Sequence, residues 1–498
     1  MPTPLKGVMK EYLEAGFEIY LVGGGVRNLI MGRVPENCDL TTNATPEQSL
    51  EVLKMHSPFY NNDFGTVSYN VMVGEKEELY EITTFRSEKE YSDYRRPDNV
   101  SWGQTLEEDV TRRDFTINAM VVGIKNEKNK LSGWIPGQAR NDKSESDSIK
   151  QEFELIDMVG GLEDFEKGLI RAVGEPRIRF NEDALRMLRA IRFAAKMGFV
   201  IEEKTLAAIS ERAELLEKIS KERIREEFMK ILGSNYPADG MRMLISTGLI
   251  NHFMPEIMEG KGIIQGGHHK LTALEHMLEA LQECPSPDPI IRLATLVHDI
   301  GKPRSQRFKC RKCGKMYRDL SDDLTTCANC GFMQPTRGMV TFYGHEVIGA
   351  KMVKEIVERL KFSRKEIDKI VTLVRWHMFA YQPEMTDAAI RRLIRKVGKE
   401  NISDLVLLRI ADRKGSGAKT TSWRFMELQK RIGEQLFEPM EINDIVVNGL
   451  DVMEVLNVKP GPIIGKVLKE LFDEVLEDTS KNNREYLLKR IVDISQVN

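Results

Sequence analysis

Residues 18–27 read EIYLVGGGVR, and this stretch decides the fold of the first part of the chain. A short apolar run over residues 19–22 enters a turn of three glycines, and residues 26–31 are predicted to form a helix. Glycines between a strand and a helix let a phosphate group approach the backbone closely. Alone, the cluster is a weak indication, because an ordinary tight turn has the same composition.

The residues after this turn indicate further strands. Residues 39–42 and 80–85 are β-rich, and residues 66–73 alternate in polarity after Gly65. From Glu182 onward the apolar residues recur at helical spacing. The pattern predicts an α+β protein, with a small α/β head that contains a sheet of several strands and a mostly α-helical remainder.

Composition limits the class of protein. The chain has 498 residues and a formal net charge of −3, which excludes binding to nucleic acid through bulk positive charge but leaves room for a local basic face. No apolar run reaches the roughly 18 residues of a membrane span, and the first residues lack the apolar core of a signal peptide. We therefore expect a cytoplasmic protein with no membrane partner and about three domains.

Four of the six cysteines form two close pairs, Cys310/Cys313 and Cys327/Cys330, each followed by a glycine. Four thiolates with this spacing bind Zn²⁺ tetrahedrally, so the sequence predicts a zinc ribbon over residues 308–333. Reduced free thiols in a loop are the alternative. The pairs are surrounded by basic residues that could contact RNA phosphates or form a solvated face: Arg304, Arg307, Lys309, Arg311, Lys312, Lys315 and Arg318.

An ordered series of motifs covers residues 18–200. They are LVGGGVR at 21–27, DLTTNATP at 39–46, ITTFR at 82–86, RRDFTINA at 112–119 and EDALRMLRAIRF at 182–193. The series resembles that of the class II tRNA nucleotidyltransferases, which include the CCA-adding enzymes and the bacterial poly(A) polymerases. The resemblance implies a polymerase-β-like head, a helical neck, and addition of CCA or part of it to tRNA 3′ ends from CTP and ATP with release of pyrophosphate.

Nucleotidyl transfer needs metal-bound carboxylates that activate a hydroxyl and stabilise the leaving pyrophosphate. The family carries two aspartates one residue apart on a strand, and here that pair reads Asn37-Cys38-Asp39. Asn28 likewise replaces the aspartate that follows the arginine of the glycine turn. Asn37 can offer Mg²⁺ a carbonyl oxygen without charge. We predict Asp39, Asn37 and Glu81 as catalytic residues, with Mg²⁺ held by Asp39 and Asn37; for Glu81 a solvated strand residue is the alternative.

The motif at 182–193 is predicted to read the base. Glu182, Asp183, Arg186 and Arg189 lie three or four residues apart and would share one helical face, where ion pairs alone could also explain them. The resemblance implies that Asp183 and Arg186 select CTP and then ATP, as side chains that imitate a Watson–Crick edge. It also implies the other nucleotide-binding residues: Gly24 and Arg27 on the triphosphate, and Arg113, Arg189 and Arg192 on the nucleotide. Asp114 is expected to support the site, and Phe115 and Ile117 to be core.

Histidines and aspartates follow in a second ordered set: His276, His298, Asp299, His345, His377 and Asp412. The set resembles the HD phosphohydrolase superfamily. Such ligands on separate helices suit one or two divalent metals, of unknown identity here, that activate water. The resemblance implies a phosphatase or cyclic phosphodiesterase acting on RNA ends, whereas histidines that satisfy polar groups of a core are the alternative.

These motifs predict four domains: a head at 1–150 with a polar insertion at 125–151, a neck at 151–265, an HD domain at 266–425 that contains the ribbon, and a helical tail at 426–498. An apolar stripe at 467–476 is expected to pack in the tail core. A basic stretch could follow an RNA backbone or be a solvated helix: Arg391, Arg392, Arg395, Lys396 and Lys399. Two rival functions stay open: a phosphohydrolase whose nucleotidyltransferase head is weakened by Asn37, and an RNA-binding protein without catalysis. The sequence also leaves open which nucleotides are added (CCA, CC, A or poly(A)) and the oligomeric state.

Overall fold

A computed structural model describes residues 1–60, 65–89, 99–102, 105–125, 152–265, 271–317, 326–327, 329–333, 340–379, 381–417 and 423–497. The chain divides into two compact units, Met1–Phe253 and Met254–Asn498. The polar insertion predicted at 125–151 lies outside the described residues except for Lys125.

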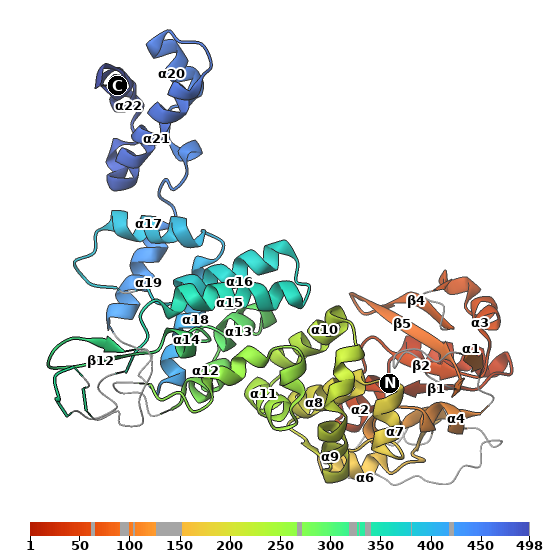
Figure 1. Ribbon diagram of the computed structural model, residues 1–498. Coiled ribbons are helices and arrows are strands. Elements are labelled where there is room, and N and C mark those ends of the chain that lie inside the picture. Colours follow the sequence, from red (N-terminus) through yellow and green to blue (C-terminus); the bar gives the residue numbers. More distant parts are fainter. Residues whose placement is uncertain are drawn as a thin grey trace. The chain divides into compact units, whose positions relative to one another are not determined.

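The first unit is built on a seven-stranded sheet with the order β3-β4-β5-β2-β1-β8-β9 (Figure 1). Its strands are β1 (Ile19–Val22), β2 (Asp39–Thr42), β3 (Phe59–Tyr60), β4 (Thr66–Val73), β5 (Lys76–Thr84), β8 (Val121–Ile124) and β9 (Phe153–Ile156). β2 and β5 are parallel, whereas β1 pairs antiparallel with both β2 and β8. The last strand lies beyond residue 150, where the sequence placed the end of the head, so the sheet uses residues on both sides of the insertion.

Helices surround this sheet and then form the neck. They are α1 (Thr3–Glu14), α2 (Gly24–Ile30), α3 (Pro46–Val52), α4 (Leu106–Thr111), α6 (Gly161–Glu166), α7 (Pro176–Glu182), α8 (Leu185–Met197), α9 (Glu203–Arg212), α10 (Lys221–Leu232) and α11 (Pro237–Ser246). Two further strand pairs are β6 (Arg86–Lys89) with β7 (Asn99–Trp102), and β10 (Leu169–Ile170) with β11 (Val200–Ile201). Within α8, Leu185, Leu188 and Ile191 are buried, as their helical spacing predicts.

Strand β1 shows how the apolar pattern builds the core of the head. Ile19 and Leu21 pack with buried residues of α1, whereas Tyr20 and Val22 pack with buried residues of α4. Because successive side chains of a strand point to opposite faces, a continuous apolar strand is covered on both sides. The glycine turn after β1 is therefore held by a fully buried strand.

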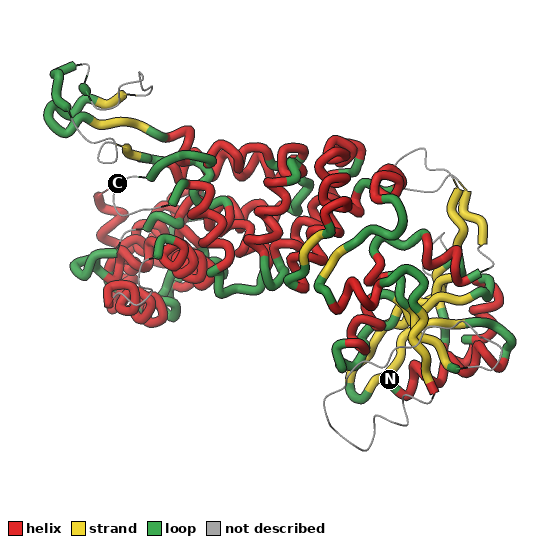
Figure 2. Tube along the Cα trace, turned by 90° about the horizontal axis from the view of Figure 1, so that it is seen from below, coloured by secondary structure: helices red, strands yellow, loops and turns green. Residues whose placement is uncertain are grey.

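The second unit is mostly helical (Figure 2), and its short strands alternate with the cysteine pairs along the sequence. Its helices are α12 (Ala273–Gln282), α13 (Pro289–Leu296), α14 (Lys302–Ser305), α15 (His345–Arg359), α16 (Arg364–Trp376), α17 (Asp387–Val397), α18 (Ile402–Gly415), α19 (Trp423–Gln435), α20 (Gly449–Leu456), α21 (Pro462–Glu477) and α22 (Arg484–Val497). A three-stranded sheet is formed by β12 (Arg307–Lys309), β13 (Met316–Tyr317) and β14 (Val340–Thr341). The α+β prediction with an inserted ribbon is confirmed.

The C-terminal helices have a core of their own. Val467, Leu471, Phe472, Val475 and Leu476 of α21 are buried against α20 and α22, as the apolar stripe predicts. The boundaries at 265 and 425 stay predictions.

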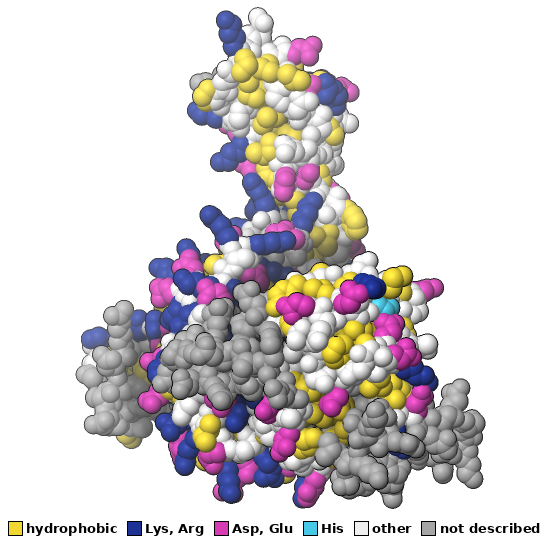
Figure 3. All heavy atoms as spheres, turned by 90° about the vertical axis from the view of Figure 1, so that its right-hand side faces the viewer, with side chains coloured by type: hydrophobic (Ala, Val, Ile, Leu, Met, Phe, Trp, Pro, Cys, Tyr) yellow, Lys and Arg dark blue, Asp and Glu magenta, His cyan; other side chains and the backbone are white. Residues whose placement is uncertain are grey.

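The surface agrees with the near-neutral composition. Basic and acidic side chains are interspersed over the face that Figure 3 shows. In the part of the chain that the structure describes, no helix combines the length and the apolar character needed to cross a membrane.

Candidate functional site

The glycine turn of the head lies beside the start of β2. Gly23 has a φ of 62°, and a Cβ atom there would lie 3.7 Å from Oδ2 of Asp39. Asp39 is directly opposite Glu81 in the parallel register of β2 and β5. Partial desolvation and the negative charge of Glu81 raise the pKa of Asp39, although Arg113 and Arg27 act in the opposite direction. Two facing carboxylates fit a divalent cation, which would relieve the repulsion that raises the pKa of Asp39.

Asn37 has a different position from these two carboxylates. Its φ of 45° is left-handed, a conformation that asparagine tolerates. Its side-chain oxygen accepts a hydrogen bond from the backbone N–H of Leu79 at 3.2 Å, and its own N–H donates to Glu78 at 3.3 Å. Both bonds fasten the entry of β2 to the neighbouring strand. The geometry therefore favours Asp39 and Glu81 as the ligand pair, with Asn37 holding their strands in register.

A chain of hydrogen bonds joins the glycine turn to the neck. Arg27 donates to the side-chain oxygen of Asn118, and Asn118 donates to Oδ1 of Asp114 at 2.8 Å. Arg189 of α8 donates twice to Oδ2 of Asp114, at 2.8 and 2.6 Å. Burial alone would raise the pKa of Asp114, but Arg189 and Asn118 hold it at about 2. Asp114 is thus an ionised, buried support, as expected from the sequence.

Three arginines gather over one aromatic ring. The guanidinium carbons of Arg192, Arg27 and Arg189 lie 4.5, 5.1 and 5.6 Å from the ring centroid of Phe193. Burial lowers the pKa of Arg27 to about 10, and the neighbouring Arg192 and Arg189 contribute to this shift, although Asp114 opposes it. Like charges this close are relieved by a polyanion, so the cluster fits a triphosphate.

The predicted Arg113 is held beside the same site. Asp109 accepts from Arg113 at 2.8 Å and from Arg112 at 2.5 Å and is fully buried. Burial would raise the pKa of Asp109, but the two arginines lower it to about 2. The backbone oxygen of Arg112 in turn accepts from Arg186 at 3.2 Å, which connects this turn to α8.

The residues predicted to read the base do not share one helix. Glu182 ends α7, whereas Asp183 is extended and accepts from the N–H of Leu185 at the start of α8. The prediction of one continuous helical face is therefore wrong, because the backbone is extended at Asp183, between the end of α7 and the start of α8. Asp183 also lies 3.3 Å from Arg223 of α10, and Arg186 donates to Glu182 at 2.6 Å. Both side chains are held in place by neighbours.

Three residues of this site have no role predicted from the sequence: Asn118, Phe193 and Arg223. Asn118 and Phe193 lie inside quoted motifs, so their positions were visible but their contacts were not. Arg223 lies 40 residues from Asp183 and gives no local signal.

In the second unit, the six predicted HD residues converge. They come from five places in the chain: α12, the turn between α13 and α14, α15, the end of α16, and α18. Each has a side-chain exposure of 13% or less. Their ligand atoms form two groups that share one carboxylate: His276, His298 and Asp299, and Asp299, His345 and His377. Asp412 adds a carboxylate oxygen 3.1 Å from Nε2 of His276.

Asp299 is the centre of this arrangement. Its Oδ2 lies 3.2 Å from Nε2 of His298 and 3.4 Å from that of His276. Its Oδ1 lies 3.2 Å from Nε2 of His345 and 3.6 Å from that of His377. One oxygen thus faces each group, which is the geometry of a carboxylate that bridges two metal ions.

The histidines are oriented for metal binding. Nδ1 of His298, His345 and His377 lies 2.7, 2.8 and 2.7 Å from a backbone carbonyl oxygen, so Nδ1 carries the proton and Nε2 is left as a ligand. The Nε2 atoms of His276 and His298 are 3.2 Å apart, as are those of His345 and His377. Two buried lone pairs that face each other fit a cation between them.

The four predicted zinc ligands also come together. Sγ of Cys310 lies 3.7 Å from that of Cys330, and Sγ of Cys313 lies 3.7 Å from that of Cys327. Four sulfurs at about 2.3 Å from a tetrahedral Zn²⁺ are about 3.8 Å from one another. The Tyr317 hydroxyl, 3.3 Å from Cys327, lowers the pKa of that thiol to about 6. The set fits a tetrahedrally bound metal ion such as Zn²⁺.

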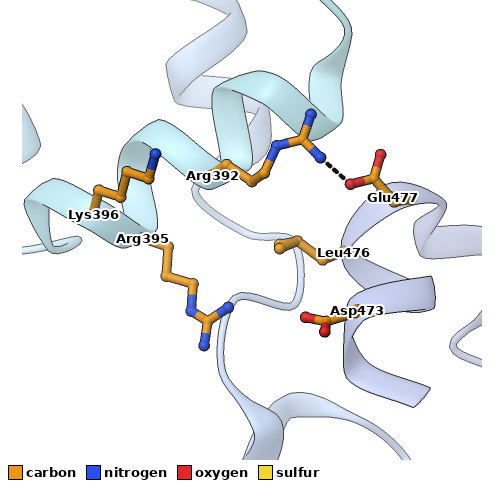
Figure 4. A pocket seen from close by; sticks show the side chains of 6 residues that line it. All are labelled: Arg392, Arg395, Lys396, Asp473, Leu476 and Glu477. Carbon is orange, nitrogen blue, oxygen red and sulfur yellow. Dashed lines mark hydrogen bonds and ion pairs between the residues drawn. The ribbon is translucent and has the colours of Figure 1, made fainter. Parts of the chain in front are cut away.

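A groove of about 520 Å³ lies between α17 and α21 (Figure 4). Its lining carries both charges: Arg392, Arg395, Lys396, Asp473, Leu476 and Glu477. Arg392 is paired with Glu477 of α21. Arg395 and Lys396 lie over the rings of Phe472 and Trp376, and no carboxylate partner is found for them among the described residues.

Arg391 has a different role from its basic neighbours. It is 4% exposed and donates to the backbone oxygens of Leu476 and Glu477 at 2.9 and 3.1 Å. Arg391 therefore neither follows an RNA backbone nor belongs to a solvated face, because its guanidinium is buried and binds the C-terminal end of α21.

Family models match both units. "Poly A polymerase head domain" covers residues 19–140, "Probable RNA and SrmB-binding site of polymerase A" covers 198–260, "HD domain" covers 269–414, and "tRNA nucleotidyltransferase domain 2" covers 343–491.

Individual proteins match over nearly the whole length. The CCA-adding enzyme of Streptococcus suis (strain 05ZYH33) is 30% identical over 481 residues, which cover 97% of this chain and 94% of that enzyme. That of Limosilactobacillus reuteri (strain DSM 20016) is 41% identical over 249 residues, 50% of this chain and 54% of that enzyme. The crystal structure of Bacillus stearothermophilus CCA-adding enzyme in complex with CTP has the same fold, with a TM-score of 0.65, 24% identity, and coverage of 100% of this chain and 99% of that chain. The chain belongs to the family of the CCA-adding enzymes.

Proposed function

We propose that this protein adds CCA, or part of it, to tRNA 3′ ends from CTP and ATP and releases pyrophosphate. The family supplies the reaction class. The observation that carries the proposal is the unbroken chain from Arg27 through Asn118 and Asp114 to Arg189. It fixes the glycine turn to the neck helix beside Asp39, and a site that grips a nucleotide from two elements needs such a connection. A tRNA substrate agrees with the cytoplasmic location predicted from the sequence.

Asp39 and Glu81 are the residues that would hold Mg²⁺ in the head. Magnesium, when bound, supplies activation of the 3′-hydroxyl and stabilises the charge on the transferred phosphate. Gly24 and Arg27 hold the triphosphate, and Arg113, Arg189 and Arg192 add positive charge around the nucleotide. The protein's part is thus positioning and charge stabilisation.

Asp183 and Arg186 select the base. A carboxylate accepts from an exocyclic amine and a guanidinium donates to the neighbouring ring acceptor, a pair that cytosine and adenine both present. Because Arg223 holds Asp183 and Glu182 holds Arg186, both groups are oriented before the nucleotide arrives.

A tRNA extension assay tests this function. The full-length protein is incubated with CTP, ATP, Mg²⁺ and a tRNA that lacks its 3′ end, and the products are sequenced. Addition of C, C and A in that order supports the proposal, and Asp39→Asn is the matched inactive control. A protein that extends no tRNA while Asp39 is intact would refute it.

The HD centre supports a second activity, hydrolysis of phosphate esters at RNA ends. The specific observation is that Asp299 places one oxygen toward each of two histidine groups. Divalent metals of a kind not yet identified would occupy these groups and activate water. Release of phosphate from RNA with a 3′-phosphate or a 2′,3′-cyclic phosphate, with Mn²⁺, Ni²⁺ or Co²⁺ added in turn, tests this. Activity that survives His298→Ala would exclude the HD centre as its source.

A further inference from the structure

We propose that the cysteine ribbon binds single-stranded RNA through a surface of lysines and aromatic rings. We call this surface the ribbon face; it consists of Lys309, Lys312, Lys315, Tyr317 and Phe332. The inference concerns a binding surface outside the head, the neck and the HD centre, and it does not depend on hydrolysis at that centre.

Charge is the first observation. Residues 307–317 read RFKCRKCGKMY, which contains five basic residues and no acidic one, in a chain whose net charge is −3. In the described part of the ribbon, 307–317, 326–327, 329–333 and 340–344, no acidic side chain occurs. Lys309, Lys312 and Lys315 are exposed. A positive surface of this kind attracts the phosphates of a nucleic acid backbone.

The second observation is that two of these lysines are paired with rings. Nζ of Lys312 lies 5.9 Å from the ring centroid of Phe332, and Nζ of Lys315 lies 5.9 Å from that of Tyr317. Phe332 is 37% exposed, so its ring remains accessible. An accessible ring beside a cation can stack a base while the cation meets the adjoining phosphate.

The third observation is that the cysteines hold these rings. Tyr317 lies 3.3 Å from Sγ of Cys327, and Phe332 accepts with its backbone oxygen from the N–H of the same cysteine at 3.0 Å. In the sequence, Tyr317 follows the first cysteine pair and Phe332 follows the second. A metal that joins the two pairs therefore also fixes one ring relative to the other. Rings fixed in this way lose little conformational entropy when a base stacks on them.

The place of the ribbon in the chain also favours the end of an RNA strand as its ligand. β12 begins at Arg307, shortly after Lys302, whose Nζ lies 2.5 Å from Asp299. β14 ends at Thr341, shortly before His345. The base of the ribbon is therefore covalently attached to both sides of the HD centre. A protein partner would suit the exposed Met333, but it would not explain the surplus of basic residues in the described part of the ribbon.

Fluorescence anisotropy with the zinc-loaded full-length protein and a short oligouridine, titrated at several salt concentrations without nucleotide, tests the proposal. The double variant Lys312→Ala/Lys315→Ala should reduce the slope of log K against log salt by about 1.4, since each cation contributes about 0.7 on single strands. The matched double change to arginine should keep the wild-type slope.

Phe332→Leu provides an independent readout, because it keeps the apolar volume and removes the stacking surface. We expect its Kd for oligouridine to rise about 5- to 100-fold at constant salt slope. Zinc content is measured for every variant, since none of them changes a cysteine. An unchanged slope in the double alanine variant together with an unchanged Kd for Phe332→Leu, at wild-type zinc content, would overturn the proposal and leave a protein partner as the occupant of this surface.

Discussion

Asp39 and Glu81 stand directly opposite each other on the parallel strands β2 and β5, and burial together with the charge of Glu81 raises the pKa of Asp39. Their strands are neighbours although 41 residues lie between Asp39 and Glu81 in the sequence. The pair supplies the charge that Asn37 lacks.

Replacing either carboxylate should therefore abolish most of the transfer. We expect Glu81→Gln and Asp39→Asn each to lower kcat for CMP incorporation by about 100-fold or more, which is about 3 kcal/mol of transition-state stabilisation. Single-turnover incorporation at saturating CTP and Mg²⁺ measures it. The double variant should be little worse than the poorer single variant, because the two act as a unit. A Glu81→Gln protein with wild-type kcat would restrict the metal site to Asp39 and other residues.

Asn37 is expected to matter more for stability than for metal binding. Its side chain accepts from Leu79 and its backbone is left-handed, which alanine tolerates less well, so Asn37→Ala should lower the free energy of unfolding by about 2 kcal/mol. The Mg²⁺ concentration that gives half-maximal activity should stay unchanged, whereas Asn37→Asp, which keeps an acceptor for Leu79 and adds a charge, should reduce it. Denaturant unfolding and a magnesium titration separate these effects. If Asn37→Ala raised the Mg²⁺ concentration that gives half-maximal activity, Asn37 would be a magnesium ligand after all.

The network through Asn118 should affect both nucleotides equally. Asn118→Ala removes the acceptor of Arg27 and a donor to Asp114, so we expect KM for CTP and for ATP each to rise about 10-fold, the effect of about 1.4 kcal/mol. Arg186→Lys should instead change the preference among CTP, ATP and UTP, because it alters the base-reading pair. Steady-state incorporation with each nucleotide tests both. A change in base preference in Asn118→Ala would show that the network acts on the base rather than on the triphosphate.

The contrast between these residues shows what could be predicted from the sequence. The glycine turn, the β-rich runs and the HD ligands are local or compositionally rare signals, and the structure brings the HD ligands together as expected. The break at Asp183 was missed because the apolar period of α8 already begins at Leu185, so the spacing of charged residues looked continuous across it. The burial of Arg391 is not predicted because its partners are distant in the sequence, 44 residues away in α19 and 85 or 86 residues away in α21. Contacts between distant segments depend on packing, which a single sequence does not reveal.

The groove of Arg395 and Lys396 should bind the tRNA backbone. Because the described residues provide them with no carboxylate partner, each can neutralise a phosphate. We expect Arg395→Glu/Lys396→Glu to raise KM for tRNA about 10-fold or more at low salt and to leave KM for CTP unchanged. Arg392→Gln, whose arginine is already paired with Glu477, is the matched control and should change KM for tRNA little. Equal effects of the two variants would indicate that the groove acts through the packing of α21 and not through phosphate contacts.

The bridging position of Asp299 predicts a stepwise loss of metal from the HD centre. Asp299→Asn weakens both groups, because Oδ2 faces His276 and His298 while Oδ1 faces His345 and His377. His276→Ala removes a ligand from one group only. Mass-spectrometric metal analysis, with any metal of the cysteine ribbon counted separately, should give two HD-centre metal ions per chain for the wild-type protein, one for His276→Ala and fewer than one for Asp299→Asn. Removal of the buried bridge takes a charged ligand from both cations and leaves Asp412 as the carboxylate beside one of them, whereas removal of one imidazole leaves the other group intact. One ion in both variants would mean that Asp299 serves a single metal, and the two-metal arrangement would be wrong.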